Sequence, residues 1–258
     1  MELTKDYKRV YVWQLPVRIF HWLNALSILI LAITGFIIAD PPAFLSNAEA
    51  WDTFWLGKVR VIHFISAYVF FGVMIMRFYW AFVGNRYAHW TAFWPFSKKG
   101  IHNLIHVLKY DILLLPEKNP KLSDISIGHN FMATSAYIIM FITALIMVFT
   151  GFGLYADNAT WWLPKLFAWV PSFLGGDFLT RQIHHFSMWI LIFIIVIHVY
   201  LVLYHDWLES RGEVSSMFSG FKFVRKERVK MEEKDDGNEF SSGYGTGSEK
   251  DFVDENEN

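Results

Sequence analysis

Four long apolar stretches dominate the chain and predict four helices that cross a membrane. A helix needs about 20 apolar residues to span a hydrocarbon core about 30 Å thick. The first stretch (Ile19–Ala39), the third (Asn130–Ala156) and the fourth (Gln182–His205) contain no Lys, Arg, Asp or Glu, and the second, from Val61 to about Val83, carries only Arg77. We expect the helices at about 18–39, 60–83, 129–153 and 182–207. The predicted fold is therefore an all-α membrane protein built on a four-helix transmembrane bundle.

The segments around these helices have a different character. Residues 98–115 place apolar side chains at helical spacing opposite basic ones, which is typical of a helix lying in the membrane interface. The Trp-rich stretch 160–176 should lie along the other interface, or serve as a docking surface for another subunit. Residues 1–17 form an N-terminal segment and 18–215 the transmembrane domain. Residues 216–258 form a tail, in which we expect disorder from about residue 231.

Composition supports a membrane protein and removes several kinds of chemistry. The chain is 54% hydrophobic and 19% aromatic, with only 18% charged residues, which is unusual for a soluble domain. It contains no cysteine. Disulfides, zinc–thiolate sites, cysteine-ligated iron–sulfur clusters and covalently attached c-type haem are therefore excluded.

The distribution of basic residues predicts the orientation of the helices. Nineteen of the 23 lysines and arginines fall in the N-terminal segment, between the second and third helices or after the fourth. The other four are Lys58, Arg60, Lys165 and Arg181. Basic residues accumulate on the cytoplasmic side of membrane proteins, so both termini are expected to be cytoplasmic.

Histidines occur inside the apolar stretches, in three cases three residues after an arginine. These three cases are 18-RIFH-21, 60-RVIH-63 and 181-RQIH-184. An ionisable side chain inside a bilayer is costly and is by default a functional candidate. A neutral histidine that merely bonds to a neighbouring helix is the alternative. The histidines concerned are His21, His63, His184 and His198.

Helix geometry sorts these histidines into two levels. His184 and His198 are 14 residues apart, about 40° short of four turns and about 21 Å along the axis, so they share a face. The neighbouring His185 is about 140° out of line with His198. Because successive helices alternate in direction, His63 falls at the outer level with His184. His21 falls at the inner level with His198.

A pair of imidazoles from two helices at each level suits the axial ligation of a haem iron. Two axial nitrogens leave no open coordination position, so such an iron transfers electrons rather than binding oxygen. We therefore predict two b haems. The outer haem is assigned to His63 and His184, and the inner haem to His21 and His198.

Arginines near these histidines are candidates to pair with the haem propionates. A guanidinium one turn nearer the membrane edge can bind a carboxylate bidentately. His198 has Ile195 in place of such an arginine, so the inner haem would use residues from other helices. The alternative is that these residues are interfacial anchors whose charged ends reach water. The candidates are Arg18, Arg60, Arg77 and Arg181.

Over roughly residues 8–215 the chain resembles the cytochrome b subunit of membrane-bound nickel–iron uptake hydrogenases. The matching stretches are 18-RIFHW-22, 60-RVIHF-64, 128-GHN-130, 181-RQIHH-185 and 198-HVYLVLYHD-206. The resemblance implies a subunit of the bacterial inner membrane that anchors the large and small hydrogenase subunits on the periplasmic side. It also implies that electrons pass from the small subunit's iron–sulfur chain to the outer haem, then to the inner haem and to quinone. The hydrogen-activating centre would then lie in another subunit.

The quinone would bind near the inner haem if this resemblance holds. His129 and Asn130 begin the third helix on that side and could bond a quinone carbonyl and supply a proton. A polar cap of the third helix is the alternative. His205 and Asp206, at the end of the fourth helix, are a second candidate, with helix termination as their alternative role.

Two other classes of protein have to be separated from this hypothesis. Another diheme four-helix cytochrome, such as a formate dehydrogenase gamma subunit or a cytochrome b561, would share the same physics and differ only in its electron donor. A transporter or haem-free anchor would be expected to show broken helices and a single site at mid-depth. The four apolar stretches here look continuous, and the histidines fall at two levels.

Overall fold

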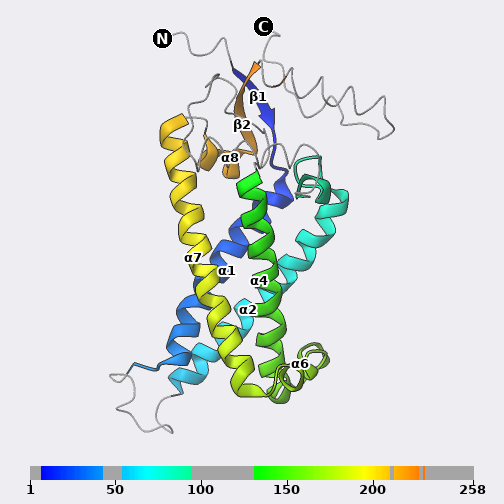
Figure 1. Cartoon of the computed structure of the whole chain (residues 1–258), viewed down its shortest axis with the longest axis vertical. Coiled ribbons are helices and arrows are strands. Elements are labelled where there is room, and N and C mark those ends of the chain that lie inside the picture. The colour runs from blue at the N-terminus through cyan, green and yellow to red at the C-terminus, as the bar shows by residue number, and fades with distance from the viewer. Residues whose placement is uncertain (1–6, 43–53, 94–130, 210–211, 227–228, 230–258) are drawn as a thin grey trace. The chain divides into compact units, whose positions relative to one another are not determined.

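The structure is a computed structural model, and it describes residues 7–42, 54–93, 131–209, 212–226 and 229. Within these residues, four helices are long and apolar enough to cross a membrane (Figure 1). This confirms the predicted bundle of four spanning helices. The helices are α1 (Leu15–Ala39), α2 (Trp55–Val83), α4 (Phe131–Tyr155) and α7 (Asp177–Glu209).

The long helices form because a chain in lipid must satisfy its backbone hydrogen bonds within each segment. Three of them begin before the apolar stretches that predicted them. Helix α1 begins at Leu15, α2 at Trp55 and α7 at Asp177, each a few residues before the expected start. Each of the four is unbroken, as expected for continuous spans.

The chain forms two compact units, each assembled from segments that are far apart in sequence. Unit 1 comprises Met1–Arg18, Trp80–Met140 and Ile194–Asn258. Unit 2 comprises Ile19–Tyr79 and Phe141–Phe193. Both histidines predicted for the outer level, His63 and His184, therefore lie in unit 2.

Unit 1 contains a two-stranded sheet that the sequence analysis did not predict. Strand β1 (Tyr7–Tyr11) pairs antiparallel with β2 (Phe221–Arg225), with Tyr7 opposite Arg225. The short helix α8 (Glu213–Ser219) precedes β2, and the turn η3 (Trp90–Phe93) also belongs to this unit. The N-terminal segment and the start of the tail are thus joined by backbone hydrogen bonds.

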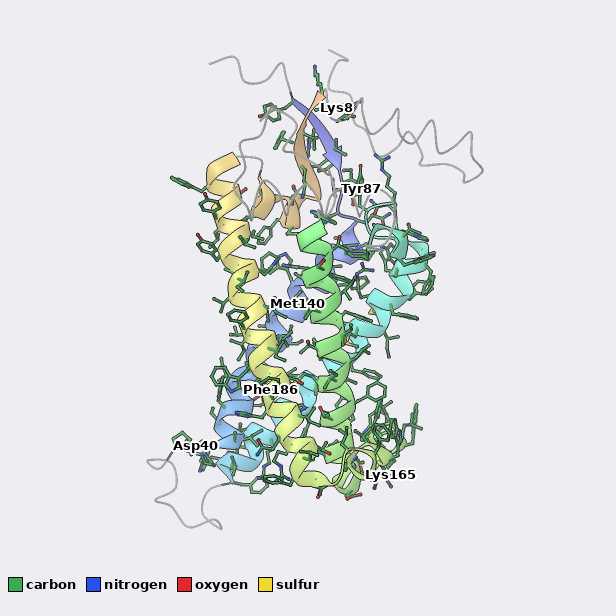
Figure 2. All side chains as sticks on the ribbon, in the orientation of Figure 1. Lys8, Asp40, Tyr87, Met140, Lys165 and Phe186 are labelled. Carbon is green, nitrogen blue, oxygen red and sulfur yellow. The ribbon has the colours of Figure 1, made fainter. Side chains whose placement is uncertain are left out.

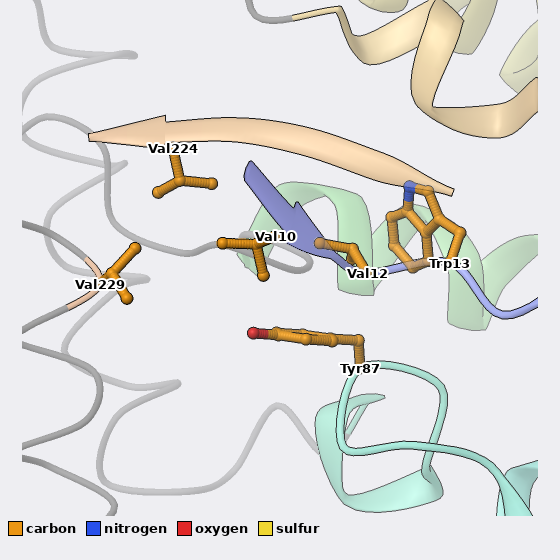
Figure 3. Packing of buried hydrophobic residues seen from close by; sticks show 6 residues of the cluster. All are labelled: Val10, Val12, Trp13, Tyr87, Val224 and Val229. Carbon is orange, nitrogen blue, oxygen red and sulfur yellow. The ribbon is translucent and has the colours of Figure 1, made fainter. Parts of the chain in front are cut away.

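A small apolar core holds this sheet in place. Val10 and Val12 are fully buried, and Tyr87 faces them from the turn after α2 (Figure 3). The remaining members of the cluster are Trp13, Val224 and Val229. The indole nitrogen of Trp13 donates a hydrogen bond of 3.2 Å to the hydroxyl of Ser216 in α8.

Polar side chains connect the start of α1 to the end of α2 within unit 1. The side-chain oxygen of Gln14 accepts hydrogen bonds from the indole nitrogen of Trp80 and from the backbone nitrogen of Asn85, both at 2.9 Å. The side-chain amide of Asn85 donates to the carbonyl oxygen of Val12 at 3.0 Å. Buried polar groups need such partners, so Gln14 is satisfied in this position.

Unit 2 contains the Trp-rich connection between α4 and α7. It folds into three short helices, η6 (Ala156–Asn158), α5 (Trp162–Lys165) and α6 (Trp169–Phe173). Within this unit, Asp40 at the end of α1 and Lys165 lie at the same end (Figure 2). The indole nitrogen of Trp161 donates to the hydroxyl of Tyr68 at 2.8 Å, while Trp162 and Trp169 remain exposed. Their expected place at a membrane interface stays a prediction.

Two other expectations fall on segments that the structure does not describe. The predicted interfacial helix at 98–115 lies outside the described residues, and so does the tail from residue 231, where disorder was expected.

Candidate functional site

His63 of α2 is held by a hydrogen bond from helix α1. Its Nδ1 lies 2.8 Å from the hydroxyl oxygen of Thr34. The same hydroxyl donates to the carbonyl oxygen of Ile30, four residues earlier in α1, at 2.6 Å. Thr34 is buried, and His63 is half-buried. One imidazole nitrogen is therefore committed to the neighbouring helix, and Nε2 is left for another partner.

His184 of α7 is held in the same way by helix α4. Its Nδ1 lies 2.8 Å from the hydroxyl oxygen of Thr150, and that hydroxyl donates to the carbonyl oxygen of Ile146 at 2.6 Å. Thr150 is only 1% exposed. The two histidines of the predicted outer level thus have matching environments. Helix α1 supplies the threonine that contacts His63 of α2, and helix α4 supplies the threonine that contacts His184 of α7.

A repeated tripeptide builds these two environments. The sequence Thr-Gly-Phe occurs at 34-TGF-36 in α1 and at 150-TGF-152 in α4. A Cβ placed on Gly35 would lie 3.6 Å from Cε1 of His63, and one on Gly151 would lie 3.1 Å from Cε1 of His184. Gly151 therefore makes room for the imidazole of His184, whereas a Cβ on Gly35 would only reach ordinary van der Waals contact with the imidazole of His63. Neither threonine was among the predicted site residues, although the repeated tripeptide is visible in the sequence.

His63 and His184 lie in the same compact unit. A Cβ on Gly35 of α1 would lie 3.6 Å from Cε1 of His63 and 3.8 Å from the sulfur of Met188, one turn after His184 in α7. Side-chain contacts connect the helices around them. Phe64, next to His63, packs against Tyr155 of α4 with ring centroids 4.1 Å apart. Phe36 of α1 packs against Trp189 of α7 at 5.2 Å. The structure therefore brings together the two histidines predicted for the outer level, while their role as ligands stays a prediction.

The neighbouring His185 has a different environment. Its side chain is exposed, and its Nε2 accepts a hydrogen bond of 3.2 Å from the indole nitrogen of Trp189, one turn later in α7. The choice of His184 over His185 as the inward-facing histidine agrees with these contacts.

The histidines predicted for the inner level fall in different units. His21 belongs to unit 2 and is half-buried, whereas His198 belongs to unit 1 and is exposed. Their pairing therefore stays a prediction. His129 and Asn130, proposed to bind quinone, lie outside the described residues, and so does the side chain of His205.

The four candidate arginines occupy different environments. Arg18 donates a hydrogen bond from Nη1 to the backbone carbonyl of Phe218 at the end of α8. Arg60 and Arg181 are exposed, and Arg77 is half-buried. Arg18 thus has a structural partner in unit 1, and the propionate role of all four stays a prediction.

No cluster of three or more His, Cys, Asp or Glu side chains suited to a metal ion occurs among the residues that the structure describes. The matching environments of His63 and His184 make these two residues the best candidate ligands in that part of the chain. A flat metal macrocycle held by one histidine from each of two helices needs only such a pair.

Comparisons with known proteins bear directly on this arrangement. The family model described as Prokaryotic cytochrome b561 matches residues 12–220, which include all four histidines. A protein of Cupriavidus necator, named "Probable Ni/Fe-hydrogenase B-type cytochrome subunit", is 34% identical over 84% of this chain and 88% of its own length. A protein of the same name from Rhodobacter capsulatus is 36% identical over 89% of this chain and 87% of its own. The "Probable Ni/Fe-hydrogenase 1 B-type cytochrome subunit" of Escherichia coli K12 is 32% identical over 87% of this chain and 95% of its own length.

Proposed function

Because the chain belongs to the prokaryotic cytochrome b561 family, we propose that it is the diheme b-type cytochrome subunit of a nickel–iron hydrogenase. In this proposal the chain anchors the large and small hydrogenase subunits to the bacterial inner membrane. It accepts electrons from the small subunit and delivers them to membrane quinone. The names of the relatives, which cover most of the chain, support a hydrogenase as the partner.

The observation that carries the proposal is the matched environment of His63 and His184. Each imidazole comes from a different helix, is anchored through Nδ1 by a threonine, and lies beside a glycine. Ligating histidines commonly bond their second nitrogen to an oxygen of the protein, which fixes the orientation of the ring. The residues present therefore fit a bis-histidine haem. Such a haem supplies a one-electron carrier with no open coordination position.

The second haem is proposed at the inner level, between His21 and His198. One haem cannot bridge a hydrocarbon core about 30 Å thick, so transfer across the membrane needs a second carrier. The 14-residue separation between His184 and His198 places their backbones about 21 Å apart along α7. Two large rings held at these levels would approach each other closely enough for electrons to tunnel between them.

The remaining roles follow from position in the chain. Arg18, Arg60, Arg77 and Arg181 are proposed to stabilise the propionates from the membrane edges. His129 and Asn130 are proposed to bind quinone beside the inner haem, with His205 and Asp206 as the second candidate.

The proposed orientation places both termini in the cytoplasm. Nineteen of the 23 lysines and arginines then lie on the cytoplasmic side. The antiparallel pairing of β1 with β2 supports an arrangement in which both ends of the chain leave the bundle on one side.

Purification of the protein from its own membranes tests the proposal. We expect it to co-purify with a nickel–iron heterodimer and to contain two haem b per polypeptide by pyridine haemochrome. Hydrogen should reduce both haems, and a soluble quinone should reoxidise them. Absence of haem would exclude a cytochrome. Co-purification with a formate dehydrogenase, and reduction by formate instead of hydrogen, would favour the alternative cytochrome.

Adding a methyl group at Gly151 is expected to disturb the outer site. The new Cβ would lie 3.1 Å from Cε1 of His184, so the imidazole would have to move by a few tenths of an ångström. Gly151→Ala should therefore lower the content of one haem or shift its absorption band. Gly72→Ala is the matched control, because a Cβ there has no neighbour within 4 Å. Equal haem spectra in the two variants would contradict this prediction.

A further inference from the structure

We infer that Thr34 and Thr150 are positioning residues, which fix His63 and His184 as Nδ1–H tautomers and thereby present Nε2 of each ring to the iron. The inference rests on the proposed outer haem and adds two residues to it. Neither threonine touches the iron in this scheme, and each acts only through the histidine that it binds.

The number of available protons sets the direction of each hydrogen bond. A threonine hydroxyl has one hydrogen and two lone pairs. Thr34 lies 2.6 Å from the carbonyl oxygen of Ile30, and Thr150 lies 2.6 Å from that of Ile146. A carbonyl can only accept, so the hydroxyl hydrogen is used there. The hydroxyl oxygen must then accept from the imidazole.

The tautomer of each histidine follows from this direction. A neutral imidazole carries one N–H, and the nitrogen that faces an accepting oxygen must be the one that carries it. In both rings that nitrogen is Nδ1, at 2.8 Å from the threonine oxygen. The two threonine oxygens also lie 3.3 Å and 3.4 Å from the backbone carbonyl oxygens of Leu31 and Met147, which can likewise only accept. Nε2 therefore keeps its lone pair, which is what a metal ligand requires.

Burial makes these contacts hard to replace. Thr34 is 6% exposed and Thr150 only 1% exposed. Both are β-branched residues inside helices, where the rotamer is further restricted by the bond to the carbonyl four residues earlier. Water cannot readily take the place of either hydroxyl. Loss of a hydroxyl would leave a buried Nδ1–H without that acceptor and free the ring to rotate.

The matching of the two contacts has a chemical consequence. An acceptor at Nδ1–H raises the electron-donating strength of Nε2 and fixes the plane of the ring. A stronger donor stabilises the oxidised iron and lowers the reduction potential of the haem. Because the contact occurs at both ligands, the outer haem should have a lower potential than it would with unsupported histidines, and a fixed angle between its ligand planes.

Substitution of the two threonines tests the inference in the hydrogenase complex. Thr34→Val and Thr150→Val remove the hydroxyl and preserve the shape. Thr34→Ser and Thr150→Ser keep the hydroxyl. Thr180→Val is the matched control, because Thr180 is buried in α7 and its hydroxyl donates to the carbonyl oxygen of Gly176, four residues earlier, at 2.9 Å. Redox titration of each haem and low-temperature EPR of the oxidised protein are the measurements.

Each valine variant is expected to shift the midpoint potential of one haem to a more positive value and to change its low-spin EPR g-values. Both valine variants should affect the same haem, and the double variant should shift the midpoint potential of that haem further. The serine variants should stay close to the wild type in potential, and Thr180→Val should match it.

Several outcomes would overturn the inference. Wild-type potentials and g-values in both valine variants would show that the hydroxyls do not act on the ligands. If a valine variant fails to take up the haem, the serine variant at the same position, which keeps the hydroxyl, should take it up. Loss of the haem in the serine variant as well would show that the missing hydroxyl is not the cause of the loss. These results are distinct from failure of the proposed function, which would appear as a wild-type protein without two haems.

Discussion

Replacement of His184 by alanine is expected to remove one haem per polypeptide, whereas replacement of His185 leaves both in place. His184 is hydrogen-bonded to Thr150 through Nδ1, and its Nε2 is the nitrogen proposed to bind the iron. His185 is exposed and accepts a hydrogen bond from Trp189. His185→Ala is therefore a close control for His184→Ala, because the two variants remove the same side chain at adjacent positions of α7.

The haem content of the His184→Ala protein should fall from two to one per polypeptide by pyridine haemochrome. His63→Ala should give the same loss, because the two imidazoles would share one iron. The redox titration should then show a single component at the potential of the remaining haem. Loss of haem in His185→Ala with full content in His184→Ala would reverse the assignment of the two histidines.

Replacement of His21 or His198 by alanine is expected to remove the other haem and to stop quinone reduction. In these variants the outer haem should still be reduced by hydrogen, because its ligands are intact. Electrons would then have no carrier across the inner half of the membrane, so the rate of quinone reduction should fall to background. Stopped-flow absorption with hydrogen and a soluble quinone measures the two steps separately.

This experiment also tests the pairing of the four histidines. The His21 and His63 variants should lose different spectral components. If they lose the same component and retain the other, the two levels have been assigned incorrectly. The pairing of His21 with His198 needs this test most, because the two residues belong to different compact units.

The four spanning helices could be predicted from sequence because about 20 consecutive apolar residues have few other stable states in a membrane protein. The 14-residue spacing in α7 predicted that His184, rather than His185, faces inward with His198. The contacts of His184 and His185 agree with this choice, while the role of His184 as a ligand stays a prediction.

The sheet and the two threonines could not be predicted by the same reasoning. Strand β1 is five residues long, and its partner lies more than 200 residues later in the chain. Its local pattern alone therefore contains no information about the pairing. Thr34 and Thr150 are ordinary residues for a membrane helix, where threonine often bonds to its own backbone. Only the spatial approach of His63 and His184 gives them a role.

The ladder between β1 and β2 has a consequence for how the protein is made. Tyr7 is synthesised first, but its partner Arg225 emerges from the ribosome only after α7 is complete. If one helix failed to insert, the two strands would be left on opposite faces of the bilayer and could not pair. Val10 and Val12 would then be uncovered and open to proteolysis. The small sheet can therefore close only when the chain between its two strands crosses the membrane an even number of times.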